Sequence, residues 1–277
     1  MHCMEVQGGS GSADYYFSRP GLDIWLTSHS ETCAKAGGND LYLVSSCASG
    51  RITRMLLADI CSNGLEFART ADDLRELMKK NINSIGQSRI VRQLGNQLEN
   101  DSQRGTFATM LLSTYFAATR NVTICNAGHA LPLLFRSNSR EWSILKHTSS
   151  EVSIKEPLHG VVSRDEYQQF ETTLEVGDLV LNYSSALSEC SDSGRHTIGC
   201  EGILDRVRQL DPHQPARLAA LLTDNIRREH CDNLAGEDGT VLLCQATPTK
   251  VGWLNNVLAP LRYLTKVSDK TRFKQRD

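Results

Sequence analysis

Short apolar runs bounded by turn residues characterise the first part of the chain. Residues 22–27 read LDIWLT, residues 41–46 read LYLVSS and residues 52–60 read ITRMLLADI. Runs of this length between clusters of Gly, Asn and Ser are typical of β-strands. We therefore expect three strands here, the second and third paired antiparallel.

The apolar pattern then changes to a helical one. Over residues 74–85 apolar side chains recur three or four positions apart, and Thr70 followed by Asp73 resembles a capping box. This combination predicts an amphipathic helix that begins at Thr70. A second apolar stripe over residues 90–98 predicts another helix, which the turn residues of 100–105 would end.

The rest of the chain repeats this alternation of strands and helices. Predicted strands cover residues 106–116, 121–125, 131–135, 178–183 and 240–246, and helical stripes cover residues 203–210 and 218–226. The segment AATRN, which links the first two of these strands, has a length suited to a hairpin. Strand clusters that alternate with helix pairs indicate a layered α+β domain.

Both ends of the chain differ from this pattern. The sequence GGSGS near the start predicts a flexible lead-in over residues 1–19, followed by one domain over residues 20–247. Residues 248–277 combine helically spaced apolar side chains with a basic tail. Two interpretations of this segment stay open: it touches a membrane surface or a partner, or it is a terminal helix packed on its own domain.

Composition and charge narrow the class of protein. The 277 residues are 40% hydrophobic and 22% charged with a net charge of -2, which is typical of a globular chain and does not favour nucleic acid as a partner. The nine cysteines show no CxxC spacing. Because no secretory signal or apolar span is visible, we expect a cytoplasmic protein.

The most specific motif is the block FATMLLSTYFAATRNVTICNAGHALPLLF at residues 107–135. Other distinctive segments are GGND at 37–40, LLADICSNGLEFA at 56–68, LEVGDLVLNYSSALSEC at 174–190 and EDGTVLL at 237–243. In this order they resemble the SpoIIE/RsbU subfamily of PPM-type (type 2C) protein phosphatases. The resemblance implies an α-β-β-α sandwich of two stacked antiparallel sheets flanked by helix pairs.

Enzymes of that family hold two Mn or Mg ions with carboxylates, and these ions activate a water for attack on phosphoserine or phosphothreonine. The resemblance places the ligand positions at Asn39, Asp59, Ser185 and Glu237. Of these, Asp59 is unchanged, Glu237 keeps the charge, and the other two are neutral. We expect all four to converge at one end of the sandwich.

The loops around these positions also depart from the family pattern. The resemblance assigns Gly38, Ile60, Asn63, Gly64 and Ala186 to the site loops, with Asn63 where the family has His and Ala186 where it has Gly.

Two further carboxylates could replace the missing ligands. Asp40 follows Asn39 and Asp238 follows Glu237. Because adjacent side chains of a strand face opposite sides, a shifted ligand would require a bulge. One weak Mn or Mg ion on Asp59 and Glu237, or no ion, is the resulting expectation.

Other conspicuous residues favour structural roles. His129 in NAGH follows a short strand at a glycine turn, and Asp178 after Gly177 suits a turn before the next strand. Cys125 and Cys244 lie in apolar runs and are expected to be buried, unreactive thiols.

Two hypotheses of function follow. In the first, the chain is a PPM/SpoIIE-like signalling domain that is a pseudophosphatase or a very weak phosphatase, because three of four ligand positions are altered. In the alternative it is an active Mn/Mg-dependent phosphatase. The resemblance implies an anti-anti-sigma-like regulatory protein, phosphorylated or not, as the partner; a homodimer is a further hypothesis.

Overall fold

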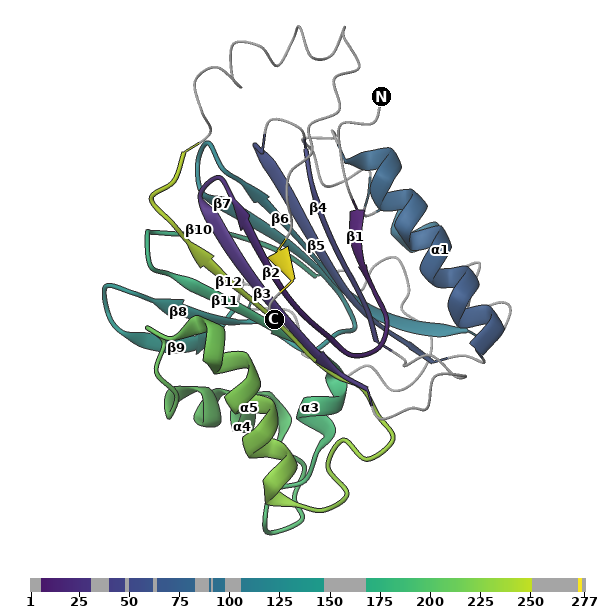
Figure 1. The fold of residues 1–277 in the computed structure, drawn as a ribbon, viewed down its shortest axis with the longest axis vertical. Coiled ribbons are helices and arrows are strands. Elements are labelled where there is room, and N and C mark those ends of the chain that lie inside the picture. The colour runs from purple at the N-terminus through teal and green to yellow at the C-terminus, as the bar shows by residue number, and fades with distance from the viewer. Residues whose placement is uncertain are drawn as a thin grey trace, which may run out of the picture.

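The computed structural model describes residues 6–30, 40–47, 50–61, 64–82, 90, 92–97, 106–146, 168–250 and 274–275. Two antiparallel sheets lie face to face, with helices on their outer faces (Figure 1). This is the α-β-β-α sandwich that the resemblance to the SpoIIE/RsbU phosphatases implies.

The first sheet has six strands, each antiparallel to its neighbours. Their order is β1 (Val6–Gly9), β4 (Asp40–Ser46), β5 (Ile52–Cys61), β6 (Phe107–Phe116), β7 (Asn121–Ala127) and β10 (Gln168–Thr173). The predicted hairpin joins β6 to β7, and β4 pairs with β5 as expected.

The second sheet has seven strands and is also antiparallel. Their order is β13 (Lys274–Gln275), β2 (Ala13–Arg19), β3 (Leu22–His29), β12 (Gly239–Ala246), β11 (Leu179–Tyr183), β8 (Leu133–Arg136) and β9 (Glu141–Ile144).

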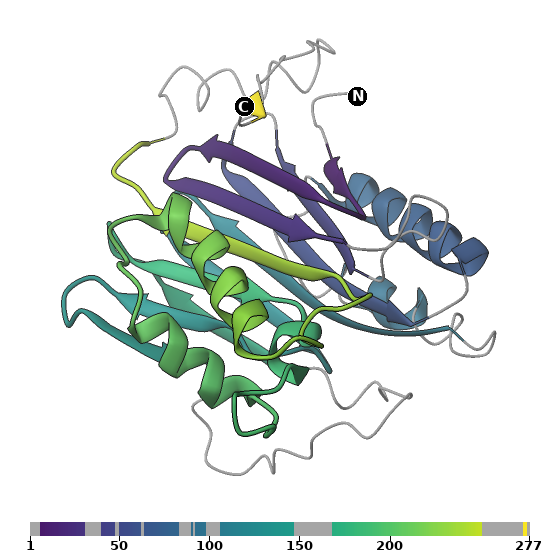
Figure 2. The same ribbon diagram turned by 60° about the horizontal axis from the view of Figure 1, so that its bottom comes forward.

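The helices cover the outer faces and leave the two inner faces to pack on each other (Figure 2). Helix α1 (Gly64–Asn81) packs on the first sheet, while α3 (Ser185–Glu189), α4 (Gly199–Arg208) and α5 (Pro215–Glu229) pack on the second. Strand β5 shows the alternation that this requires: Met55 and Leu57 belong to the core between the sheets, and Leu56 and Ala58 to the core under α1.

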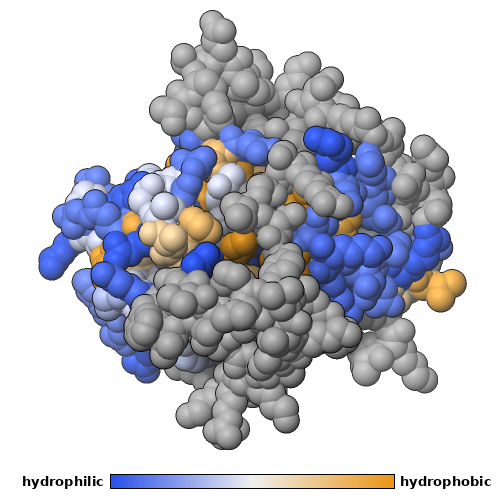
Figure 3. Space-filling model, turned by 90° about the horizontal axis from the view of Figure 1, so that it is seen from above, coloured by the Kyte–Doolittle hydropathy of each residue, from blue (hydrophilic) through white to orange (hydrophobic). Residues whose placement is uncertain are grey.

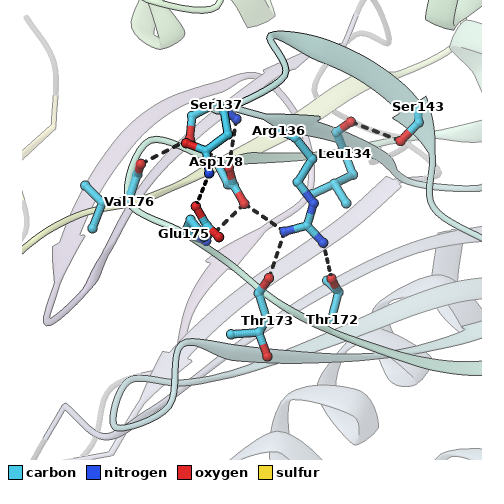
Figure 4. A network of polar contacts seen from close by, with 10 residues as sticks. Leu134, Arg136, Ser137, Ser143, Thr172, Thr173, Glu175, Val176 and Asp178 are labelled. Carbon is cyan, nitrogen blue, oxygen red and sulfur yellow. Dashed lines mark hydrogen bonds and ion pairs between the residues drawn. The ribbon is translucent and has the colours of Figure 1, made fainter.

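An Arg136–Asp178 clamp joins the two sheets at one end of the sandwich (Figure 4). Arg136 donates to Asp178 Oδ2 at 2.8 Å and also to the Thr173 carbonyl at 2.7 Å, which links β8 to β10. Asp178 accepts from the Ser137 amide at 2.8 Å and from the Glu175 amide at 3.0 Å. Asp178 thus closes the turn before β11, as predicted.

The N-terminal segment corrects one expectation, because residues expected to be a flexible lead-in form β1 and β2. Strand β1 pairs with β4, and Gly8 is required there because a Cβ atom would lie 2.0 Å from the Tyr42 carbonyl oxygen. Gly8 thus allows close contact between β1 and β4.

The start of α1 is a second correction. The helix begins at Gly64 and not at Thr70, which is buried inside it. The earlier start lets Phe67 pack in the core beneath the helix, and this burial outweighs the local capping signal.

Three features were missed or lie partly outside the described residues. Strands β9 and β10 were not predicted. Residues 92–97 are helical, as expected, but the turn at 100–105 lies outside the described part of the chain. In the C-terminal segment, β13 pairs with β2, and the predicted helix lies outside the described residues.

Candidate metal site

Asp40 and Asp59 face each other on neighbouring strands. They are paired residues in the β4–β5 ladder. On β4 Tyr42 and Val44 belong to the core between the sheets, and on β5 Met55 and Leu57 do. By alternation both aspartates therefore lie on the inner face of the first sheet, at the end opposite the Arg136–Asp178 clamp.

The second sheet contributes Asp238, the residue directly before β12. Its Oδ2 accepts a hydrogen bond from the Asp40 amide at 3.3 Å. The two residues are 2% and 3% exposed, and within the described part of the chain neither Asp40 Oδ2 nor Asp238 Oδ1 has a hydrogen-bond partner. Because buried carboxylate oxygens are costly to leave unsatisfied, these two atoms mark a place for a ligand.

Hydroxyl groups of the second sheet line the same interior end. Ser184 Oγ accepts from the Thr240 amide at 3.0 Å, and the Thr240 hydroxyl lies 2.9 Å from that of Ser28. Ser184 and Thr240 also interact with the Asp40 carboxyl group. These contacts fix the strand ends that carry Asp40 and Asp238.

Burial and neighbouring carboxylates raise the pKa of Asp40 and of Asp59. Burial, followed by Glu189, Glu237 and Asp238, raises the pKa of Asp59 to about 6. Burial is also the main cause that raises the pKa of Asp40 well above its usual range, and the Asp59 and Asp238 carboxylates add to it. A cation bound between these carboxylates would offset both the cost of burying their charge and their mutual repulsion.

A polar network lies beside Asp59 on the same face. Thr109 is the β6 partner of Asp59, and its hydroxyl lies 2.9 Å from His129 Nδ1. Asn126 holds the His129 backbone, accepting from its amide at 2.7 Å and donating to its carbonyl at 2.8 Å. Burial lowers the pKa of His129 to about 4, so the ring is neutral near pH 7. These contacts agree with the structural role predicted for His129.

The predicted site residues fall into three groups. Asp40, Asp59 and Asp238 come together, and Glu237 is exposed but close enough to raise the Asp59 pKa. Ser185 begins α3, Ala186 is buried, and Gly64 begins α1. Ile60 faces α1 rather than the site, and Gly38, Asn39 and Asn63 lie outside the described residues.

Two details differ from the expected ligand geometry. Asp40 needs no bulge to reach the interior, because the β4–β5 ladder runs without interruption from Asp40 to Ser46. Before β12, Asp238 is the buried carboxylate and Glu237 is the exposed one.

Glu189 was missed by the sequence analysis. It stands four residues after Ser185, so both lie on one side of the short helix α3, and its charge raises the Asp59 pKa. No motif or apolar periodicity pointed to this five-residue helix, so the sequence offered no signal for Glu189.

The donor set fits a hard divalent cation. Mn²⁺ and Mg²⁺ prefer carboxylate oxygens, and Asp40, Asp59 and Asp238 offer them with two oxygens unpaired. The three aspartates are, however, not close enough together to enclose an ion tightly. Among the described residues, three donor atoms within 4.8 Å of one another are found at His230, Cys231 and Asp232 and not in the aspartate cluster. The arrangement therefore suits one loosely held ion.

Two stacked antiparallel sheets with aspartates at one end define the class of PPM-type, or type 2C, phosphatase folds. A family model described as "Stage II sporulation protein E (SpoIIE)" matches residues 49–247. The chain belongs to the SpoIIE family.

Solved structures support the fold. The RsbU and RsbW domains of Rv1364c from Mycobacterium tuberculosis are similar at 19% identity with a TM-score of 0.65, covering 92% of this chain and 71% of that one. The phosphatase domain of SpoIIE from Bacillus subtilis with a regulatory fragment is similar at 16% identity and a TM-score of 0.62, covering 88% and 70%. RsbX in complex with magnesium is similar at 13% identity and a TM-score of 0.56, covering 84% and 100%. None of the curated proteins compared with the chain matches it.

The described surface is largely hydrophilic from the side that Figure 3 shows, with smaller apolar areas between polar ones. Four large apolar side chains are exposed among the described residues: Leu65, Phe107, Val176 and Leu221. Among the described residues, no helix is both long enough and apolar enough to span a membrane.

Proposed function

We propose that the chain is a SpoIIE-like signalling domain with weak Mn²⁺- or Mg²⁺-dependent phosphatase activity, far below that of a complete two-ion site. One observation carries the proposal: Asp40, Asp59 and Asp238 converge with unpaired oxygens, whereas the position at Ser185 supplies only a neutral hydroxyl.

The residues have distinct roles in this proposal. Asp40, Asp59 and Asp238 would hold the ion, and Ser184 and Thr240 keep their strand ends in place. When bound, the ion would supply Lewis acidity and lower the pKa of a coordinated water. Glu237 and Glu189, exposed at the rim, add the negative field that attracts a cation.

Weak activity follows from the ligand count. A two-ion clamp stabilises both the entering and the leaving oxygen of the displacement, and it requires enough carboxylates to neutralise two divalent ions. Asn39 and Ser185 carry no charge, so the remaining aspartates favour one ion. The substrate we propose is a phosphoserine or phosphothreonine of a regulatory protein, because the fold relatives include RsbU, RsbX and SpoIIE domains.

A non-catalytic binding module is the second candidate. It is favoured by Ser185, which puts a neutral side chain where the family carries a carboxylate, and by the buried Ala186 beside it. Such a pseudophosphatase would bind an anti-anti-sigma-like regulator, a second copy of this chain or, through residues 248–277, a membrane surface or another partner, without hydrolysis.

The test is hydrolysis of an aryl phosphate and of a phosphoserine peptide, each with Mn²⁺ and with chelator. We expect slow, Mn²⁺-dependent turnover that Asp59→Asn abolishes, with Asp224→Asn, a substitution on α5, as a matched control. Turnover that chelator or Asp59→Asn leaves unchanged would indicate a contaminant, and absence of turnover at high Mn²⁺ would favour the binding module.

A further inference from the structure

A second group of metal-binding side chains lies at the end of α5. His230 is the C-cap residue of this helix, and Cys231 and Asp232 follow it in a turn. One donor atom from each lies within 4.8 Å of the others. His230 Nδ1 lies 3.6 Å from Asp232 Oδ2, and Cys231 Sγ lies 3.7 Å from Asp232 Oδ1.

The donor chemistry differs from that of the aspartate cluster. Imidazole nitrogen, thiolate sulfur and carboxylate oxygen together are typical ligands of Zn²⁺, whereas Mg²⁺ and Mn²⁺ prefer oxygen alone. A thiolate and a carboxylate would also neutralise the two charges of the ion. This balance matters because Arg227 and Arg228 stand in the last turn of α5.

The position favours a cation in a second way. The peptide dipoles of a helix align along its axis and leave partial negative charge at its C-terminal end. His230 caps this end of the fifteen-residue helix α5. Glu229, the last helical residue, pairs with Arg206 and is therefore engaged elsewhere.

The backbone after the trio is firmly held. Asn233 donates to the Ser191 and Ile226 carbonyls, both at 2.8 Å, and accepts from the Ser191 amide at 2.9 Å. Leu234 is 2% exposed and keeps a left-handed φ of 59°. Because the turn is already ordered, binding of an ion there would cost little additional backbone entropy.

We propose that His230, Cys231 and Asp232 form a Zn²⁺ site with water in the remaining coordination position. Cys231 and Asp232 are exposed and His230 is partly exposed, so the ion has direct access from solvent. The site is separate from the Asp40–Asp59–Asp238 cluster in its ligands and its metal preference. It uses the connection from α5 to β12, which also carries Asp238.

The test is titration of the reduced full chain with Zn²⁺ in competition with a chromogenic chelator, followed by Co²⁺ substitution to detect a thiolate-to-metal charge-transfer band. We expect one Zn²⁺ that Cys231→Ser weakens about tenfold or more, corresponding to at least ~1.4 kcal/mol. His230→Ala and Asp232→Asn should each weaken it as well, and Cys231→Ser should remove the charge-transfer band.

The chain offers matched controls. Cys61 is another exposed thiol, and His196 is an exposed histidine beside Asp192. Cys61→Ser, His196→Ala and Asp59→Asn should leave the affinity and the band unchanged, with circular dichroism confirming that every variant is folded. A band that survives Cys231→Ser, or affinity that falls equally in the controls, would overturn the proposal and indicate adventitious binding only.

Discussion

Asp40 and Asp59 are paired at one end of the β4–β5 ladder, on the inner face of the first sheet. The Asp40 amide donates a hydrogen bond to the Asp238 carboxylate of the second sheet. Like charges this close inside a protein repel one another and lose hydration.

The first prediction concerns pH and stability without divalent ions. Burial and neighbouring carboxylates raise the Asp59 pKa from 3.8 to about 6, so between these values the folded state binds more protons than the unfolded state. The stability that Asp59 contributes in this way is therefore fully present below pH ~4, and roughly 3 kcal/mol of it is lost as pH rises through ~6. Urea unfolding in chelator should show this decline in the wild type, and Asp59→Asn should reduce it to the part that the raised pKa of Asp40 contributes. An equal decline in both proteins would contradict the assignment.

The second prediction concerns restoring the missing charge. Ser185→Asp adds a carboxylate beside the cluster, so without metal it should lower the melting temperature through repulsion. With Mn²⁺ the melting temperature of this variant should rise more than that of the wild type, because the ion binds only the folded state. The measurement is thermal unfolding with Mn²⁺ and with chelator, and Ser188→Asp on the same helix is the control. Equal shifts in the two variants would show that the geometry around Ser185 no longer suits a ligand.

The third prediction concerns the buried Asp238. Asp238→Asn keeps the size of the side chain but removes one negative charge, so it should stabilise the metal-free protein at pH 8 and weaken its response to Mn²⁺. Glu237→Gln, at the exposed neighbouring position, should have the smaller effect on both. Chemical unfolding of the two variants with and without Mn²⁺ compares them; a larger effect of Glu237→Gln would mean that Glu237 is the ligand.

The fourth prediction concerns the opposite end of the sandwich. Arg136→Ala removes the partner of the buried Asp178 and breaks the link from β8 to β10, which should cost about 1–3 kcal/mol of unfolding free energy. Although burial opposes it, hydrogen bonds from Ser137, Glu175 and Arg136 hold the Asp178 pKa below its usual range. Its stabilisation is present above the unfolded pKa of ~4 and is lost on acidification, and Arg136→Ala should reduce that loss. Acid unfolding should show the difference, with Mn²⁺ affinity unchanged; a loss of Mn²⁺ affinity would contradict the separation of the two ends.

The apolar pattern predicted most of the strands and a layered α+β domain, and the resemblance to the SpoIIE/RsbU phosphatases implied the sandwich. In that sandwich neighbouring residues of one strand face two different apolar cores, as Met55 and Leu56 do. It could not predict the start of α1, because the burial of Phe67 is a tertiary effect. Strand β1 was missed for a similar reason: Gly8 has its role only against the Tyr42 carbonyl.

The candidate site was less accessible to sequence reasoning than the fold. Asp59 was found from its motif. The position of Asp40 depends on the register of β4 against β5, and the position of Asp238 depends on how the two sheets pack. A sequence motif specifies neither the register nor the packing. Glu189 lies in a five-residue helix, which is too short for apolar periodicity to predict.

The most direct test of the central claim is calorimetric titration of Mn²⁺ into Cys231→Ser and into the double variant Cys231→Ser/Asp238→Asn, so that the second site does not contribute. We expect weak binding of a single ion in Cys231→Ser, and loss of that binding in the double variant. Tight binding of two ions, or binding that Asp238→Asn leaves unchanged, would contradict the central claim.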